Sequence, residues 1–341
     1  MSKMPPWFAV SLRLSLAVLA AASSACKSPQ AYGERNSIIL RVDSAVWSAH
    51  EPLLEETLEP RIFTTRSERT FEITPVFPWA PQWEQLREWQ QVVVLGTTED
   101  PLVQDLLGRA GAAVEPGTSA QLENVWARGQ IVTVVALPPE LDAERLRAQL
   151  QQVHRLIDRE FIAWVRDRMF ASGVNDSLRD ALRARGFSLT IPNVYDFATQ
   201  DSFFRFRNAH PDPGSLIRSL LVTWVPEEAP GLPDAARLRA WREDADDRFY
   251  DPPQDVAPQG LRYDTVTVQE RRALEMRGVW EDRSDFPAAG PFIARAVPCP
   301  EQGRLYYMDA WLYAPGQEDK YAYVIQLETL LDSFRCIVPG E

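Results

Sequence analysis

The sequence has few of the residues on which metal and nucleophilic chemistry most often depend. Its 341 residues include three histidines, His50, His154 and His210, which lie far apart along the chain. The spacings of a phosphate-binding loop, a zinc protease, a serine hydrolase, a Cys-x-x-Cys redox pair and a calcium loop are all missing. We therefore expect no metal ion and no cofactor, and no residue is singled out as catalytic.

A long apolar segment is missing from the N-terminus as well. Residues 14–22 form a short, largely apolar core, far below the roughly 20 residues that a permanent membrane-spanning helix needs. Lys3 and Arg13 supply positive charge before or at the start of this core, and the small residues 23–25 follow it. These three parts are typical of a secretory signal, so we expect residues 1–25 to be removed on export.

Cysteine is scarce, with three residues in the whole chain. Cys26 directly follows the small residues of the leader, a pattern that resembles the lipobox of bacterial lipoproteins, where the thiol receives a diacylglyceryl group. We expect lipidation of Cys26 and a polar tether over residues 26–36, because two or three acyl chains hold a protein stably at a membrane. Ser23 stands where the lipobox usually has leucine, so cleavage by an ordinary signal peptidase at the same bond is the alternative.

The other two cysteines, Cys299 and Cys336, form an even pair in an exported chain. An oxidising compartment allows them to form a disulfide bond. The bond requires a particular Cα separation that a sequence does not reveal. The disulfide and a pair of free, buried thiols are therefore both open.

Positive charge is in the minority. The chain has 36 basic and 48 acidic residues, and its net charge of −12 becomes −14 when the two basic residues of the leader are removed. So acidic a surface argues against a nucleic-acid partner and against a basic membrane-binding patch. The 45% hydrophobic and 25% charged residues are typical of a globular protein.

The first half of the mature chain alternates between strand-like and helix-like segments. The strand-like segments are 37–42, 91–95 and 131–137, and the helix-like segments are 101–109 and 142–171. Such alternation predicts an α/β sandwich over residues 37–171. The turn-forming residues at 172–176 then indicate a domain boundary.

The second half, residues 177–338, has more antiparallel signals. Strand-like segments occur at 187–191, 203–207 and 216–225, and a three-strand meander is expected from 272–280, 291–297 and 304–313. Helices are expected at 234–248 and 319–334, and the proline-rich segment 250–260 is expected to be a surface loop. The overall prediction is an α+β protein whose second domain has an antiparallel sheet with a packed C-terminal helix.

Trp47 is the first candidate ligand-binding residue. It lies four residues after Asp43, where a strand turns into a helix. The favoured interpretation is structural, with Asp43 capping the helix and Trp47 packing on it. The alternative is a tryptophan that stacks on a ligand beside an acceptor group, as in sugar-binding sites.

Arg277 and Trp280 are the other candidates. Arginine can bind carboxylate or phosphate in a planar fork, and tryptophan can stack on a cation. In a strand, however, residues 278 and 280 face one side and residue 277 faces the other, which argues against a shared site. An ion pair of Arg277 with Glu275 is the favoured interpretation.

Aromatic residues also gather between Pro75 and Pro81, where Phe77 and Trp79 lie. This stretch could be an exposed loop that grips a partner or a membrane interface. We favour an irregular cover over the core, because aromatic side chains bury large areas. Gly290 and Pro291 are expected to form a turn before the next strand.

Four segments of the chain carry a resemblance to a known family. They are residues 36–47, 186–195, 275–280 with 290–292, and 311–315 with 321–331. In this order they resemble the bacterial envelope lipoproteins of domain-of-unknown-function family 4837, although Ala289 stands where that family tends to have glycine. The resemblance implies an envelope location and a shared fold, and it implies no activity.

The sequence is compatible with two functions. The first is a non-enzymatic scaffold, anchored by its lipid on the periplasmic or outer side of a membrane, that binds an envelope protein or glycan. The second is a carboxylate-dependent hydrolase acting on an envelope polymer. A cleft with two carboxylates, one of them desolvated, would favour the hydrolase, and an aromatic-rimmed surface would favour binding.

Overall fold

The computed structural model describes residues 28–285 and 287–337, which form two compact units. The first unit contains the described residues up to Glu51 together with Ile73–Leu146, and the second contains Pro52–Glu72 and the chain from Arg147 onward. This division groups residues 147–171 with the second unit, whereas the sequence suggested a boundary after residue 171. The signal peptide expected at 1–25 and the lipidation expected at Cys26 lie outside the described residues.

The first unit is built on a five-stranded sheet. The strands lie in the order β4 (Glu72–Val76), β1 (Ser37–Arg41), β5 (Gln91–Thr97), β7 (Ile131–Leu137) and β6 (Ser119–Glu123). Strands β1, β5 and β7 are parallel, and β6 is antiparallel to β7. The three parallel strands are almost continuously apolar and buried, as strands covered on both faces are.

Helix α4 (Pro101–Arg109) packs on this sheet through Val103, Leu106 and Leu107. Its first turn is stabilised by Asp100, whose side chain accepts a hydrogen bond from Leu102 N at 2.9 Å. Two further helices of this region are α2 (Ser44–Leu58) and the short α3 (Trp83–Leu86). At the start of α2, Ala45 N donates to the side chain of Asp43 at 2.8 Å, as expected for a cap.

The long helix expected after the first sheet is α5 (Ala143–Met169). Its apolar residues recur every three to five positions, and this stripe is buried, whereas the opposite positions are exposed. The buried residues are Leu146, Leu150, Val153, Ile157, Phe161, Val165 and Met169. Burial of one face explains why this sequence is helical over so many turns.

The second unit contains an eight-stranded antiparallel sheet. The strands lie in the order β12 (Gln254–Val256), β14 (Arg271–Asp282), β15 (Ala289–Cys299), β16 (Arg304–Tyr313), β11 (Ile217–Pro226), β10 (Phe203–Asn208) and β9 (Asp196–Gln200), with β13 (Arg262–Val268) also paired to β14. Strands β14, β15 and β16 pair consecutively. The predicted three-strand meander is therefore confirmed.

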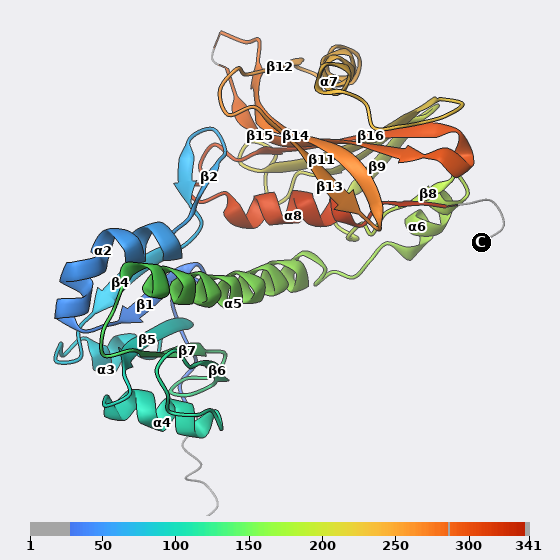
Figure 1. The fold of residues 1–341 in the computed structure, drawn as a ribbon. Coiled ribbons are helices and arrows are strands. Elements are labelled where there is room, and N and C mark those ends of the chain that lie inside the picture. Colours follow the sequence, from blue (N-terminus) through green and yellow to red (C-terminus); the bar gives the residue numbers. More distant parts are fainter. Residues whose placement is uncertain (1–27, 286, 338–341) are drawn as a thin grey trace, which may run out of the picture. The chain divides into compact units, whose positions relative to one another are not determined.

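The two faces of this sheet are covered by different helices (Figure 1). Helix α8 (Tyr321–Asp332) packs on one face, where Val324, Leu327 and Leu331 join the larger core. Helix α7 (Ala235–Phe249) packs on the other, where Leu238 and Ala245 join a second core. The antiparallel sheet with its packed C-terminal helix confirms the predicted α+β class.

Small elements complete the second unit. They are the hairpin β2 (Arg61–Phe63) and β3 (Ser67–Arg69), helix α6 (Asp176–Arg183), the 3-10 helix η1 (Pro300–Gln302), and the paired strands β8 (Phe187–Ser188) and β17 (Arg335–Cys336).

Three expectations from the sequence are wrong in detail. The segment 250–260 is not a surface loop, because it contains β12 and because Tyr250 and Gln254 are buried. An edge strand can begin directly after prolines, since a proline that lies outside the paired strand removes no hydrogen bond between strands. Gly290 and Pro291 lie inside β15 rather than in a turn. Trp79 does not cover the core: its ring stacks on Phe77, and the residue is 74% exposed.

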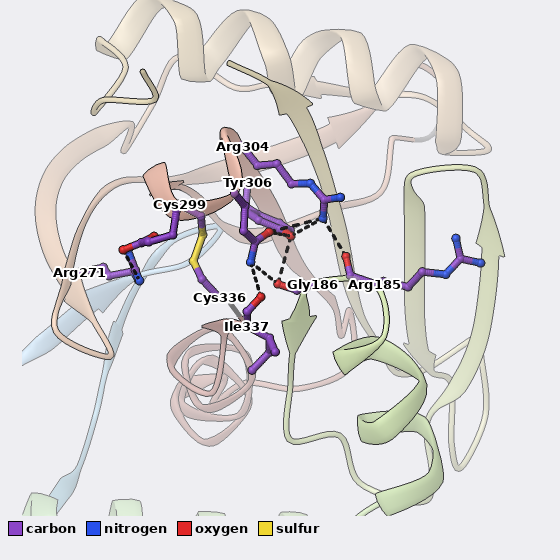
Figure 2. The surroundings of a disulfide bond; sticks show 10 residues. Arg185, Gly186, Arg271, Cys299, Arg304, Tyr306, Cys336 and Ile337 are labelled. Carbon is purple, nitrogen blue, oxygen red and sulfur yellow. Dashed lines mark hydrogen bonds and ion pairs between the residues drawn. A yellow bond between two sulfur atoms is a disulfide. The ribbon is translucent and has the colours of Figure 1, made fainter. Parts of the chain in front are cut away.

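Cys299 and Cys336 form a disulfide bond, with their Cα atoms 6.2 Å apart. Figure 2 shows the bond at the end of β15, beside Tyr306 and Gly186. The side chain of Gln302 donates to the carbonyl oxygens of Gly186 at 2.6 Å and Ile337 at 2.8 Å. The C-terminal strand is thus held to the sheet by both covalent and hydrogen bonds.

Among the helices of residues 28–285 and 287–337, none combines the length and the apolar character that crossing a membrane requires.

Candidate binding pocket

A cavity of about 260 Å³ opens on the α7 face of the sheet in the second unit. Its walls come from β10, β11, β14 and β16 and from the chain that follows α7. Five aromatic side chains line it, and so do four charged ones. The aromatic residues are Phe249, Tyr250, Trp280, Trp311 and Tyr313, and the charged ones are Arg205, Arg207, Asp251 and Asp282.

The register of the strands brings these side chains together. Arg207 in β10 pairs with Ser219 in β11, and Ser219 pairs with Trp311 in β16. Directly paired residues of neighbouring strands project from the same face, so the three form one row across the pocket. Ile217 and Tyr313 form the next row.

Trp280 is a fixed part of the wall. Its indole N–H donates to the Leu312 carbonyl oxygen at 3.1 Å, and its ring meets Trp311 edge-on at 5.5 Å. Gly290 lies opposite Trp280 in the ladder, and a Cβ at this position would overlap the Leu312 carbonyl. Glycine at position 290 therefore allows β15, β16 and the indole of Trp280 to approach one another closely.

Three polar groups at the pocket are buried without a hydrogen-bond partner among the described residues. They are the indole Nε1 of Trp311, the hydroxyl of Ser219 and the Nε of Arg207. A buried polar group left unsatisfied costs about 1–3 kcal/mol. Ordered water or a polar ligand can satisfy such groups.

A buried ionic network supports the pocket from behind. Arg242 of α7 is fully buried and donates to Asp246, to Asp309 at 3.3 Å and to Gln254 at 3.2 Å. The hydroxyl of Tyr250 donates to the second oxygen of Asp309 at 3.0 Å. Because Tyr250 and Gln254 also line the pocket, the network fixes one of its walls.

Burial raises the pKa of both carboxyl groups in this network. Burial raises the pKa of Asp246 to about 8; the Arg242 guanidinium opposes this shift, and Asp309 adds to it. Burial likewise raises the pKa of Asp309. Two desolvated carboxylates share one guanidinium here, so at neutral pH the group is most stable with one carboxyl protonated.

These desolvated carboxylates do not line the cavity. Two other acids do line it, Asp251, which is exposed, and Asp282. Asp282 has a lowered pKa: burial acts to raise it, but hydrogen bonds from the side chain and backbone of Ser284 outweigh that effect. A carboxyl of that kind is ionised at neutral pH and is a poor general acid. The two strongly desolvated carboxyl groups of this region thus lie in the network of Arg242 and not at the cavity.

The structure separates the three candidate residues chosen from the sequence. Trp280 lines the pocket. Arg277 faces the α8 side of the sheet, where it pairs with Glu275 and Glu328. Trp47 lies in the first unit, half-buried in the first turn of α2. Residues 277 and 280 thus lie on opposite faces of the sheet, as the alternation of side chains along a strand predicted.

The sequence reasoning missed Ser219, Trp311 and the network of Arg242. One signal could have pointed to the network: Asp309 is the only acidic residue in the apolar strand 304–313, and such an acid needs a buried partner. The row from Arg207 to Trp311 could not be found, because it depends on the pairing of strands about 100 residues apart.

Over the described ranges 28–285 and 287–337, no cluster of three or more histidine, cysteine, aspartate or glutamate side chains could hold a metal ion.

Three solved structures show distant, partial likenesses to this chain. The Ran-binding protein Mog1p of Saccharomyces cerevisiae is 10% identical, with 46% of this chain and 92% of that chain covered and a TM-score of 0.32. LpqN, described as involved in cell envelope biogenesis of Mycobacterium tuberculosis, is 12% identical, with coverages of 43% and 79% and a TM-score of 0.28. A protein of Bacteroides thetaiotaomicron VPI-5482 is 8% identical, with coverages of 46% and 47% and a TM-score of 0.26. At these values the likenesses say nothing about function.

The sequence matches none of the curated proteins. It does match one protein family, described as Domain of unknown function (DUF4837), over residues 252–333. This span runs from β12 to α8 and contains Trp280, Asp309, Trp311 and Tyr313. Over this part of its second unit the chain is therefore similar to the DUF4837 family, which agrees with the resemblance seen in the sequence.

Proposed function

We propose that the protein is a membrane-anchored envelope lipoprotein that binds a small polar ring, such as a sugar unit of an envelope glycan, in the pocket beside α7. The observation that carries the proposal is the pairing of an aromatic wall with unpartnered buried donors, the indole N–H of Trp311 and the hydroxyl of Ser219. Ligand sites commonly combine apolar and aromatic walls with a few placed polar groups.

The size and charge of the pocket narrow the ligand class. A volume of about 260 Å³ lies just below the roughly 300–1,000 Å³ of typical ligand sites, which suits a single ring better than a long chain. The rings of Trp311 and Tyr313 offer apolar faces, while Arg207 and Asp282 offer a donor and an acceptor. A polyhydroxylated ring has both an apolar face and hydroxyls that donate and accept.

The envelope location rests on separate observations. The leader over residues 1–25 and Cys26 directly after it are typical of an exported lipoprotein. The disulfide between Cys299 and Cys336 supports export, since such bonds persist in oxidising compartments.

Binding is favoured over hydrolysis because of the position of the acids. A glycosidase-like mechanism needs two carboxyl groups flanking the bond that is cleaved. The two desolvated acids, Asp246 and Asp309, are both engaged by Arg242 behind the pocket wall.

Ligand binding can be followed by the tryptophan fluorescence of the purified full chain during titration with glucose and N-acetylglucosamine. We expect at least one sugar to change the emission of the wild type. Ser219→Ala, which removes one donor and little volume, should weaken that binding by about five- to tenfold, the equivalent of one hydrogen bond of about 1–1.5 kcal/mol. Trp79 is an exposed tryptophan of the first unit, so the control variant Trp79→Phe should bind the sugar as tightly as the wild type. No response to either sugar, or full affinity in Ser219→Ala, would contradict the proposed pocket.

Lipidation can be tested by growing a bacterial host that expresses the full chain with an alkyne-tagged fatty acid. We expect the wild type to carry the label and to sediment with membranes, and Cys26→Ala to lose both properties, because the thiol is the expected attachment point. Cys336→Ala serves as the matched control and should stay labelled. A wild type without label would place the protein in the soluble periplasm instead.

A further inference from the structure

A second cavity, of about 500 Å³, lies in the second unit away from the α7 pocket and shares no lining residue with it. Its walls come from the C-terminal half of α5, from α8 and from the chain around β10 and β11. Trp164 and Arg168 belong to α5, Tyr323 to α8 and Arg218 to β11.

The charge of this cavity is opposite to that of the protein. Its described lining residues include two arginines, Arg168 and Arg218, together with His210, and no aspartate or glutamate. The whole chain carries a net charge of −12. A local cluster of positive groups on so acidic a protein concentrates anions at one place.

Tyr195 supplies an independent sign of a ligand. Its side chain lines the cavity and is 5% exposed, and its hydroxyl has no hydrogen-bond partner among the described residues. Burial raises the pKa of Tyr195 to about 12, and the charge of Arg218 acts to lower it. The hydroxyl therefore keeps its proton and can donate a hydrogen bond at any physiological pH.

Arg218 is held in place while its Nε–H remains without a partner among the described residues. Its two terminal nitrogens donate to Gln326 at 3.1 Å and to the His210 carbonyl oxygen at 2.8 Å. Its Nε is buried and has no partner among the described residues. A guanidinium fixed in this way can donate to an anion without losing further rotamer freedom.

The rest of the lining mixes aromatic and apolar residues with polar ones such as Ser172 and Asn208. The Arg168 guanidinium lies 5.0 Å from the centre of the Trp164 ring, and the Arg218 guanidinium lies 5.9 Å from that of Tyr323. Met169 and Leu216 also line the cavity. The site thus pairs two placed donors with surface that prefers a hydrocarbon group.

We propose that this second cavity binds an amphiphilic organic anion. Its carboxylate or phosphate group accepts hydrogen bonds from Tyr195 Oη and Arg218 Nε, and its hydrocarbon part lies against Met169 and Leu216. The proposal does not depend on the sugar-binding function of the α7 pocket.

Calorimetric titration of the full chain with hexyl phosphate, hexanoate, hexanol and inorganic phosphate separates the contribution of the anionic group to binding from that of the hydrocarbon chain. We expect at least one of the two hexyl anions to bind, and to bind at least tenfold more tightly than both hexanol and inorganic phosphate. The tighter of the two anions identifies the head group, and either order supports the proposal. Hexanol or inorganic phosphate binding as tightly as the hexyl anions would overturn it, and so would no binding of either anion.

Tyr195→Phe is the decisive variant, because it removes one hydroxyl that the fold does not use. We expect it to weaken binding of the preferred hexyl anion by about tenfold, as the loss of a hydrogen bond to a charged group should. Arg168→Gln should also weaken binding, whereas Arg183→Gln, on the exposed end of α6, should not. An unfolding temperature equal to that of the wild type would confirm that Tyr195→Phe is folded. Unchanged affinity of this folded variant for the preferred hexyl anion would refute the proposed hydrogen bond from Tyr195.

Discussion

Replacing Arg242 with glutamine should lower the free energy of unfolding by about 3–5 kcal/mol, the usual cost of removing one partner from a buried ion pair. Arg242 is fully buried, pairs with Asp246 and Asp309, and lies over the Phe292 ring at 3.8 Å. Its loss leaves two carboxyl groups without their cation at positions that are fully buried. Urea denaturation followed by circular dichroism measures the change.

Arg239→Gln is the matched control. Arg239 lies in the same helix and pairs with Glu243 at the same four-residue spacing, but the two side chains are 45% and 48% exposed. Exposed pairs of this type contribute about 0.3–0.5 kcal/mol, so this variant should be nearly as stable as the wild type. Equal losses in the two variants would show that the network behind the pocket does not hold the helix to the sheet.

Breaking the Cys299–Cys336 disulfide should cost roughly 3–4 kcal/mol. The bond closes a loop with a sequence separation of 37 residues, and a cross-link of that span removes chain entropy of this size from the unfolded state. Cys336→Ala is the preferred variant, because Cys299 is fully buried and a free thiol is tolerated there as a small apolar group. The midpoint of denaturant unfolding, measured with and without a reducing agent, gives the effect.

A reducing agent provides the internal control for this prediction. It should lower the stability of the wild type to about that of Cys336→Ala, and it should leave Cys336→Ala unchanged. Wild-type stability that is equal with and without complete reduction would mean that the hydrogen bonds of Gln302 to Gly186 and Ile337 suffice to hold the C-terminal strand.

Elements with a strong local pattern could be predicted from the sequence. The amphipathic pattern of residues 142–171 predicted nearly the full length of α5. The long apolar segments of β14, β15 and β16 predicted the three-strand meander. Strands β4 and β6 were missed because they carry polar residues and few apolar ones. Strand β12 was missed because its flanking prolines resemble those of a loop.

Of the residues that line the candidate pocket, the sequence singled out only Trp280. Its polar groups, Ser219 and Arg207, are ordinary residues whose role depends on their neighbours across the sheet. Arg242 resembles any charged residue of a surface helix, since α7 has charges around most of its circumference. Its burial becomes visible only when Asp309 is placed opposite it.

The sequence by itself determined the acidic character of the chain and the α+β class, and it predicts an export signal at residues 1–25, because leader, charge and periodicity are properties of local composition. The tertiary structure alone decided which side chains meet. Antiparallel pairing brings β10, β11 and β16 side by side although about 100 residues separate β10 from β16. It thereby groups an aromatic wall and unpartnered donors at one cavity, and Tyr195 and Arg218 at another. Such groupings depend on strand register and burial, which no single segment of the chain contains.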